Sequence, residues 1–246
     1  MKDRGIPMFN MDGSPLGEDG GLISEGVLGM EHTHDTGQRI AYWSKEMSQG
    51  TTVEMYELLK NDDTNLLNIR DKQWTDEVTS RVGPRLDRVA IVVENIETTA
   101  KFYTDVMGLK RHPMKNDIDG DINDDTGGMK MTFIDANGVW LVLVQPTGPG
   151  PLMDLLQEKG DGYIAELIAE VDDLGVYYDQ LKAKGIELSD INGAPFKNNE
   201  KGFVLEPFGD RAAYLPSNMA CGMVIEVYQR GPRDTSLIHR RDDSWK

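Results

Sequence analysis

The strongest constraint on the fold is a pattern of strand, helix cap, helix and glycine that occurs twice along the chain. In the first copy, residues 86–93 (LDRVAIVV) are typical of a partly buried strand, because β-branched residues are dense there. Asn95 favours a helix start, and Gly108 favours its left-handed end. One face of this predicted helix carries Ile96, Ala100, Tyr103 and Met107.

Two further strands complete the first copy. We predict them over residues 129–135 and 139–145, since Ala136, Asn137 and Gly138 between them form a turn sequence typical of a hairpin.

The second copy repeats these features in the same order. Residues 165–171 (AELIAEV) predict a strand, Asp172 or Asp173 a cap, and Gly185 a helix end. The predicted helix face carries Leu174, Tyr178 and Leu181, and the strands that follow are RAAYL and GMVIEVYQ. Val93 corresponds to Val171 and Arg88 to Glu166, 78 positions apart in each case. Such a repeat indicates a duplicated module and one shared sheet assembly.

The repeat also divides the chain. Residues 85–230 form the predicted domain, with modules over about 85–148 and 160–230. Residues 1–84 are an N-terminal extension, in which a Gly-, Asp- and Pro-rich arm precedes short helices predicted at GQRIAYWSKEM and TTVEMYELLKND. Residues 231–246 form a C-terminal tail.

The charge balance excludes several partners. With 42 acidic residues against 26 basic ones, the net charge is −16, which disfavours nucleic acid and anionic membranes as partners. The single cysteine, Cys221, forms no internal disulfide and favours the cytoplasm. No apolar run reaches the roughly 20 residues that span a bilayer. We therefore expect a soluble, acidic, cytoplasmic protein.

The repeated segments resemble a known family. LDRVAIVVENIETTAKFYTDVMGL, IAEVDDLGVYYDQLKAKGI and AAYLPSNMACGMVIEVYQ are similar to the vicinal oxygen chelate (VOC) superfamily, which includes glyoxalases, and most closely to its methylmalonyl-CoA epimerase-like members. The resemblance covers about residues 86–229. It implies an α+β fold in which paired βαβββ modules form a curved mixed sheet around one cavity, where family members bind a divalent metal.

The metal positions of the family are altered in this chain. Carried over position by position, the four ligands fall on Arg88, Val142, Glu166 and Glu226, so only Glu226 keeps a usual ligand type in its place. Arginine has no lone pair to offer and valine cannot coordinate. We therefore expect a degenerate site without a metal cofactor, in which Arg88 replaces the cation.

Strand alternation places the candidate site residues on one face of the sheet. Glu166 and Glu226 are the candidate proton donor and base, and Arg88 is the candidate group that stabilises negative charge. The candidate substrate-binding residues on this face are Trp140, Tyr228, Val142, Ile168 and Tyr214. Two structural alternatives stay open: the charged residues form only a salt-bridge cluster, and the aromatic residues belong to the core.

A second metal hypothesis concerns EHTHDTG. His32 and His34 point to one side if this segment is a strand, and with Glu226 they would bind Zn, Fe, Mn, Ni or Mg. The alternative is a polar loop that binds nothing. We expect His112 and His239 to be surface residues.

These observations favour an enzyme of the isomerase or lyase type. Its reaction would be proton transfer next to a carbonyl or oxygenated carbon of a small organic acid or aromatic substrate. The alternatives are a sequestration protein of the same fold, which binds a small molecule without chemistry, and a metal-dependent VOC enzyme that uses His32 and His34. A homodimer is expected, since modules of this kind commonly pair across their edges.

Overall fold

The structure is a computed structural model of the whole chain. It describes residues 9, 15, 39–43, 50–51, 53–57, 84–112, 122–124, 128–136, 138–197, 200–205, 209–219 and 223–232. The chain divides into two compact units, Met1–Arg81 and Val82–Lys246, and each is described by itself.

The first unit contains an antiparallel strand pair. Strand β1 (Arg39–Tyr42) pairs with β2 (Glu54–Glu57), so that Ile40 lies opposite Tyr56. The helices predicted here are therefore wrong over Arg39–Tyr42 and Glu54–Glu57, and the rest of both predicted segments lies largely outside the described residues. Apolar spacing in such short segments fits a helix and a strand equally well, and the pairing across the hairpin decides between them.

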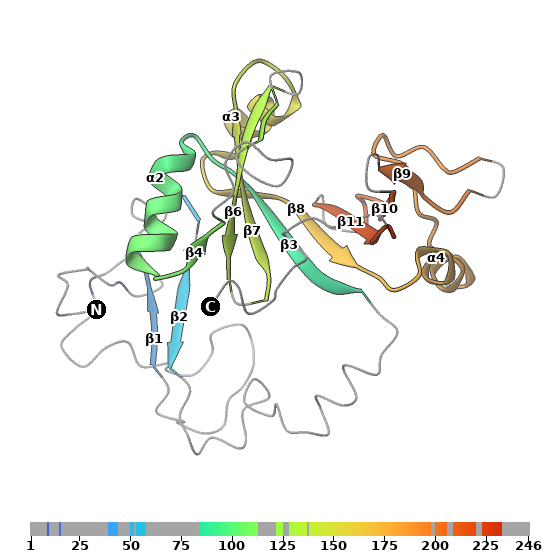
Figure 1. Ribbon diagram of the computed structural model, residues 1–246, viewed down its shortest axis with the longest axis horizontal. Helices are drawn as coiled ribbons and strands as arrows, with labels where there is room; N and C mark the ends of the chain where they lie inside the picture. The colour runs from blue at the N-terminus through green and yellow to red at the C-terminus, as the bar shows by residue number, and fades with distance from the viewer. Residues whose placement is uncertain are drawn as a thin grey trace. The chain divides into compact units, whose positions relative to one another are not determined.

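The second unit is built on one mixed sheet of nine strands (Figure 1). The first module contributes β3 (Arg85–Val92), β4 (Lys110–Arg111), β5 (Ile122–Asp124), β6 (Met129–Asp135) and β7 (Trp140–Pro146). The second contributes β8 (Tyr163–Glu170), β9 (Phe203–Leu205), β10 (Asp210–Tyr214) and β11 (Val224–Gln229). The strand order is β4-β6-β7-β3-β8-β11-β10-β9, and β5 pairs with β6 outside this path.

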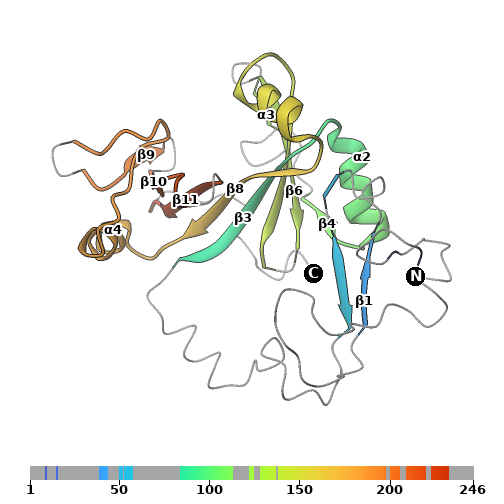
Figure 2. The same cartoon turned by 180° about the vertical axis from the view of Figure 1, so that it is seen from behind.

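This order has the symmetry that the repeat predicts. Strand β3 is parallel to β7, β8 is parallel to β11, and the first strands of the two modules, β3 and β8, pair antiparallel at the centre of the sheet. Figure 2 shows β3 and β8 side by side from the opposite direction. The predicted α+β class and the paired modules with a mixed sheet are confirmed.

Each module carries a helix after its first strand. In the first module α2 (Ile96–Lys101) begins at Asn95, whose side chain accepts a hydrogen bond from the Thr98 backbone N–H, and continues as the π-helical turn η3 (Phe102–Val106). In the second, α4 (Leu174–Ala183) begins at Asp173, which caps the Val176 N–H in the same way. Both predicted caps are confirmed.

A third helix, which we did not predict, connects the modules. Helix α3 (Pro151–Lys159) begins with a proline at its first position, where the missing N–H costs nothing. None of its residues is fully buried, but its apolar residues Leu152, Met153, Leu155 and Leu156 have helical spacing and are partly buried, so the sequence contained a helix signal that we missed.

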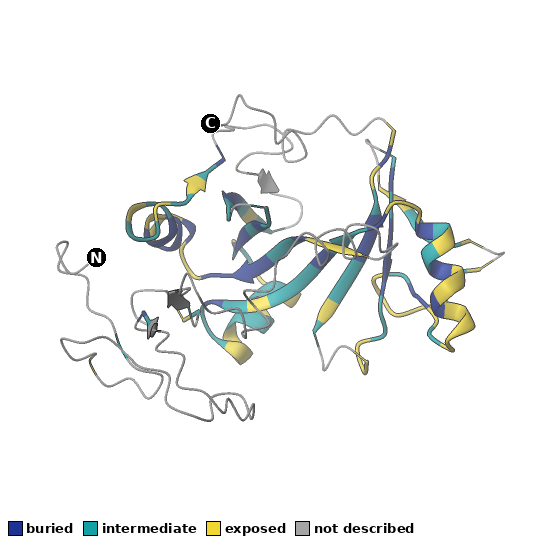
Figure 3. Ribbon diagram, turned by 90° about the horizontal axis from the view of Figure 1, so that it is seen from below, coloured by how far each residue is buried: buried dark blue, intermediate teal, exposed yellow. Residues whose placement is uncertain are grey.

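The two faces of the sheet bury different residues. On the face covered by α4, the helix packs Leu174, Tyr178 and Leu181 against Val171, Ala213 and Val227 of the sheet region. Figure 3 shows buried and exposed positions on opposite sides of this helix. The other face carries the candidate site. Within the described part of the chain, no helix is long and apolar enough to cross a membrane.

Candidate functional site

The candidate site residues lie in two adjacent rows across the sheet. The strand register places the first row in the order Trp140, Arg88, Ile168, Glu226 and Tyr214, from β7 through β3, β8 and β11 to β10. The neighbouring row contains Val142, Ala90, Glu166 and Val224. The predicted sharing of one face is therefore confirmed, because alternation puts both rows on the same side.

A bulge at the start of β3 adds a residue that the sequence analysis missed. The register with β8 shifts between Leu86 and Arg88, so Asp87 is the extra residue at this point. Its carboxylate accepts a hydrogen bond from Arg88 Nε at 2.8 Å and one from the Tyr228 hydroxyl at 3.0 Å. Strict alternation would send Asp87 to the opposite face, so no periodicity could have found it.

Arg88 is held from two directions by this arrangement. Its guanidinium carbon lies 4.7 Å from the centre of the Tyr228 ring, in a cation–π contact, while Asp87 binds its Nε. Burial lowers the pKa of Arg88, but Tyr228 and Asp87 raise it by more, so its net pKa lies above the ordinary value. Arg88 is therefore a permanent cation with a fixed orientation.

Glu166 has a strongly raised pKa. Burial is the largest cause that raises its pKa, and the negative charge of Glu226 raises it further, whereas Arg88 lowers it. The outcome is a pKa of about 7. A carboxyl with this pKa exchanges a proton readily near neutral pH.

Glu226 has a hydroxyl partner. The Tyr214 hydroxyl donates a hydrogen bond to Glu226 Oε2 at 2.7 Å, across the pair of strands β10 and β11. Burial raises the pKa of Glu226, while this hydrogen bond and Arg88 oppose the rise. The Tyr214 ring stacks on Phe203 at 5.9 Å between centroids, which fixes the hydroxyl in place.

The aromatic candidates differ from one another in exposure. Trp140 and Tyr228 are each 1% exposed, Trp140 within the cluster of Ala90, Phe133, Val142 and Val144, and Tyr228 against Ile168 and Ala212. Packing therefore accounts for both rings in this structure, and substrate stacking on them stays a prediction. Tyr214 presents its hydroxyl to Glu226, as described above.

The histidine predictions have different outcomes. His112 is buried, at 6% exposure, and its ring centre lies 5.7 Å from that of Trp140, so its assignment to the surface is wrong. It follows the two-residue strand β4, and its N–H bonds to the carbonyl of Phe133 on β6, which draws it under the sheet edge. His32, His34 and His239 lie outside the described residues.

The four positions that hold the metal in this family do not fit a cation here. Val142 is part of the apolar cluster around Trp140, and Arg88 is a positive charge in the row that contains Glu226. Among the described residues, no three His, Cys, Asp or Glu side chains are grouped as metal ligands would be. We therefore derive no chemical step through a metal.

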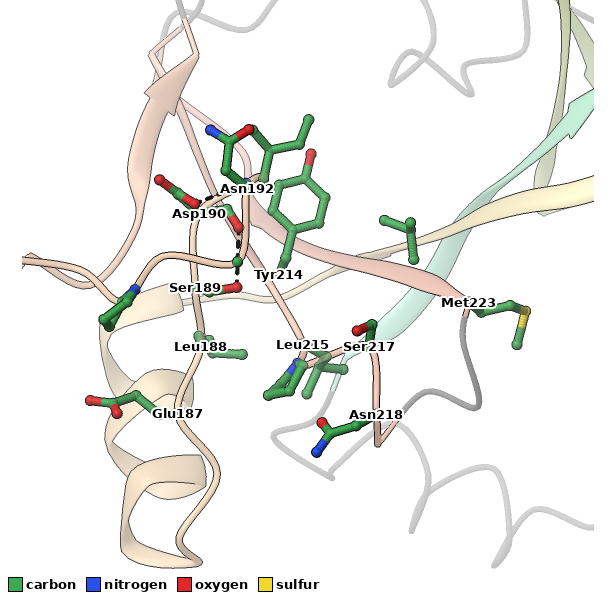
Figure 4. Close-up of a pocket in the computed structure, with 15 residues that line it drawn as sticks. Glu187, Leu188, Ser189, Asp190, Asn192, Tyr214, Leu215, Ser217, Asn218 and Met223 are labelled. Carbon is green, nitrogen blue, oxygen red and sulfur yellow. Dashed lines mark hydrogen bonds between the residues drawn. The ribbon is translucent and has the colours of Figure 1, made fainter. Parts of the chain in front are cut away.

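A groove of about 510 Å³ lies at one end of the site rows. It runs between the loop 187–195, the turn 215–218 and the start of β11, and Tyr214 and Val224 belong to its wall. Figure 4 shows Asp190, Asn192 and Tyr214 toward one end of the groove and Met223 toward the other. The sequence analysis did not predict this groove, because loops from three separate segments form it.

The sheet of paired modules, with its site on the face opposite α4, defines a protein of the vicinal oxygen chelate class. The sequence model of the Glyoxalase/Bleomycin resistance protein/Dioxygenase superfamily matches residues 85–213, just over half of the chain. The chain belongs to this superfamily, as the resemblance implied.

Solved structures with a similar fold include two bacterial proteins. A hypothetical protein of Bacillus halodurans C-125 is 21% identical with a TM-score of 0.46, over 63% of this chain and 99% of its own. Methylmalonyl-CoA epimerase of Mycobacterium tuberculosis is 21% identical with a TM-score of 0.45, over 60% of this chain and 88% of its own. Similarity at this level carries no substrate over to this chain. No curated protein matches it.

Proposed function

We propose that this protein is an isomerase or lyase that transfers a proton next to a carbonyl or oxygenated carbon of a small organic acid or aromatic substrate. The observation that carries the proposal is Glu166, whose pKa of about 7 arises beside a second carboxyl, Glu226, and a fixed cation, Arg88. A carboxyl poised at neutral pH near a second acid and a cation suits acid–base chemistry.

Each charged group has a role in this proposal. Ionised Glu166 removes the proton from the carbon next to the carbonyl, and the electron pair of the broken C–H bond moves toward the carbonyl oxygen. Arg88 stabilises the negative charge that develops on that oxygen. Glu226, when protonated, returns a proton to the carbon for an isomerase, or to the leaving group for a lyase.

Asp87 and Tyr214 act as positioning residues. Asp87 occupies Arg88 Nε and so holds the guanidinium plane in one orientation. Tyr214 donates to Glu226 Oε2 and so fixes which oxygen of that carboxyl is engaged. Neither residue needs to contact substrate for these effects.

The test is proton exchange with solvent. A panel of small carboxylates with a carbonyl next to a C–H carbon is incubated with the protein in D₂O, and deuterium at that carbon is followed by NMR. We expect exchange of at least one member, reduced about 100-fold or more in Glu166→Gln, in line with the contribution of general acid–base catalysis. The control is Glu158→Gln on exposed α3, which should leave exchange unchanged. Exchange that is equal in wild type and Glu166→Gln would contradict the proposal.

A second candidate is a sequestration protein of the same fold. It is favoured by the ion pair between Arg88 and Asp87, which already balances the arginine charge at 2.8 Å. Such a protein would deplete a ligand from solution without forming product or exchanging a proton. The D₂O measurement separates the two, because a bound ligand with undiminished C–H signals supports sequestration.

A further inference from the structure

The groove at the end of the site rows adjoins the two glutamates. Tyr214, in the groove wall, lies opposite Glu226 in the strand register, and Val224, also in the wall, lies opposite Glu166. Val224 is 43% exposed, so this part of the wall is accessible. A molecule whose reacting carbon lies at the glutamates would therefore extend its remaining atoms into the groove.

The charges of the groove wall limit which chemical groups the non-reacting part of such a molecule can carry. The described residues that line it include no lysine, arginine or histidine, and they include two acids, Glu187 and Asp190. One oxygen of Asp190, Oδ1, accepts the N–H groups of Asn192 and Ala194 at 2.9 Å each, which holds the carboxylate in the loop. Glu187 lies 4.0 Å from Lys182 on α4, but none of the described lining residues is a cation, so a phosphate in the groove would meet the Asp190 charge without a cation in the wall to balance it.

The remaining groups of the wall suit an uncharged ligand. Apolar contacts are offered by Met223, Val224 and Ile191, which is 70% exposed. Hydroxyl and amide groups are offered by the exposed residues Ser217, Asn192 and Asn218. Apolar surface with a few neutral hydrogen-bonding groups is typical of small-molecule sites, and about 510 Å³ lies within their size range.

We infer that this groove binds the non-reacting part of the substrate, and that this part is uncharged, bears hydroxyl or amide groups, and contains no phosphate. The inference rests on the proposed function, since it concerns the substrate of the glutamate site. The substrate class is then limited to small acids and carbonyl compounds whose non-reacting part is uncharged. Phosphate esters and nucleotide-linked thioesters are excluded, because their phosphates would lie in the groove.

The experiment compares neutral compounds with their phosphate esters. Uridine is paired with uridine 5′-monophosphate, and pantetheine with 4′-phosphopantetheine. Binding to the full chain is followed by NMR through ¹³C-labelled methionine and isoleucine methyl groups, with Met223 and Ile191 as reporters and Ile164, on β8 outside the groove wall, as the reference. We expect at least one neutral member to shift the reporters in the millimolar range, and its phosphate ester to bind at least tenfold more weakly.

Two lysine variants test whether the discrimination against phosphate esters arises in the groove. Asn218→Lys adds a cation to the wall and should raise the affinity for the phosphate esters, whereas Gln180→Lys on the exposed side of α4 adds the same charge elsewhere and should not. Phosphate esters that bind wild type as tightly as their neutral partners would overturn the inference. So would the absence of any reporter shift with both neutral members.

The failure of this inference differs from the failure of the proposed function. The reporter shifts of Met223 and Ile191 do not depend on proton transfer, because the groove wall does not include Glu166. If the glutamates transfer no proton, the reporter shifts still occur. If the groove binds no neutral compound, exchange at the glutamates is still measurable.

Discussion

The charge of the partly buried Arg88 is balanced by its immediate neighbour in the chain. The bulge brings Asp87, at 8% exposure, to the same side as Arg88 and Tyr228, and the three groups form a closed set of contacts at 2.8, 3.0 and 4.7 Å. Buried charges persist in proteins where such partners compensate for lost hydration. The arginine thus has its counter-charge independently of the two glutamates.

Removal of the Asp87 charge should destabilise the fold. In Asp87→Asn the guanidinium loses its buried ion-pair partner, and we expect the free energy of unfolding to fall by about 2 to 3 kcal/mol. Urea unfolding followed by tryptophan fluorescence measures the change. Asp179→Asn removes an exposed partner of Lys201 and should have a much smaller effect. Equal effects of the two substitutions would show that the Asp87 contact contributes no more than a surface pair.

The residue types of the site were predictable, but not all of their contacts. Alternation predicted that Arg88, Glu166 and Glu226 share a face, because period-2 alternation survives through most of each strand. It could not predict Asp87, since a bulge breaks the alternation. His112 was wrongly assigned to the surface, because burial at a sheet edge depends on which strands pack there.

Among the helices and strands, the two modules fix the ends of their helices with the same kinds of contact. Besides its capping residue, each helix has its first N–H bound by a glutamine from the last strand of its module: Ile96 N–H by Gln145 Oε1 and Leu174 N–H by Gln229 Oε1, both at 3.0 Å. Gly108 and Gly185 end the two helical segments with φ near +76° and +78°. The capping residues and the glycines are local in sequence and occur in both modules, and therefore most of the second unit was predictable, whereas the glutamine contacts join distant residues and were not predicted.

The two caps should contribute similarly to stability. Asn95→Ala and Asp173→Ala each remove the acceptor for one N–H of the first helical turn, and we expect each to lower the free energy of unfolding by about 1 kcal/mol. The double variant should lose the sum, because the caps lie in different modules and share no partner. Denaturant unfolding of the three variants measures this. If only one of the two single variants has a lower free energy of unfolding, the two caps are not equivalent.

The elements that were missed are short. Helix α3 has nine residues with a partly buried apolar side, and strands β1 and β2 have only four residues each. For such segments the residues that pack against them decide the structure, and these contacts cannot be inferred from the sequence of the segment itself.

Across the whole molecule, the two duplicated modules carry different side chains at their equivalent positions. The equivalent positions hold Arg88 and Val142 in the first module and Glu166 and Glu226 in the second. The two carboxyls proposed to exchange protons therefore belong to one copy and the permanent cation to the other. The homodimer and the cytoplasmic location stay predictions; a dimer would have twice the 27.5 kDa of the chain in light scattering.

The acidity of Glu166 should make stability depend on pH. Its pKa is about 7 when folded, above the 4.5 of an ordinary glutamate, so the folded state binds more protons between these values. Its stabilising contribution is complete below about pH 4.5 and is lost as the pH rises through about 7, by at most about 3 kcal/mol. Glu166→Gln lacks this loss, so its free energy of unfolding should exceed that of wild type more at pH 8 than at pH 5. An unchanged difference between the two pH values would contradict the raised pKa.

We infer that a proton-exchanging carboxyl and a fixed cation occupy the positions where this family binds its metal. The most direct measurement is the pH titration of the Glu166 side-chain carboxyl by ¹³C NMR, in wild type, Glu226→Gln and Arg88→Met, with and without added Zn²⁺. We predict a pKa of about 7 in wild type. It should be lower in Glu226→Gln, since a negative neighbour is removed, and higher in Arg88→Met, since a positive one is removed. Zinc should change none of these values. A Glu166 that titrates near 4.5, or one whose titration shifts on stoichiometric zinc binding, would contradict the claim.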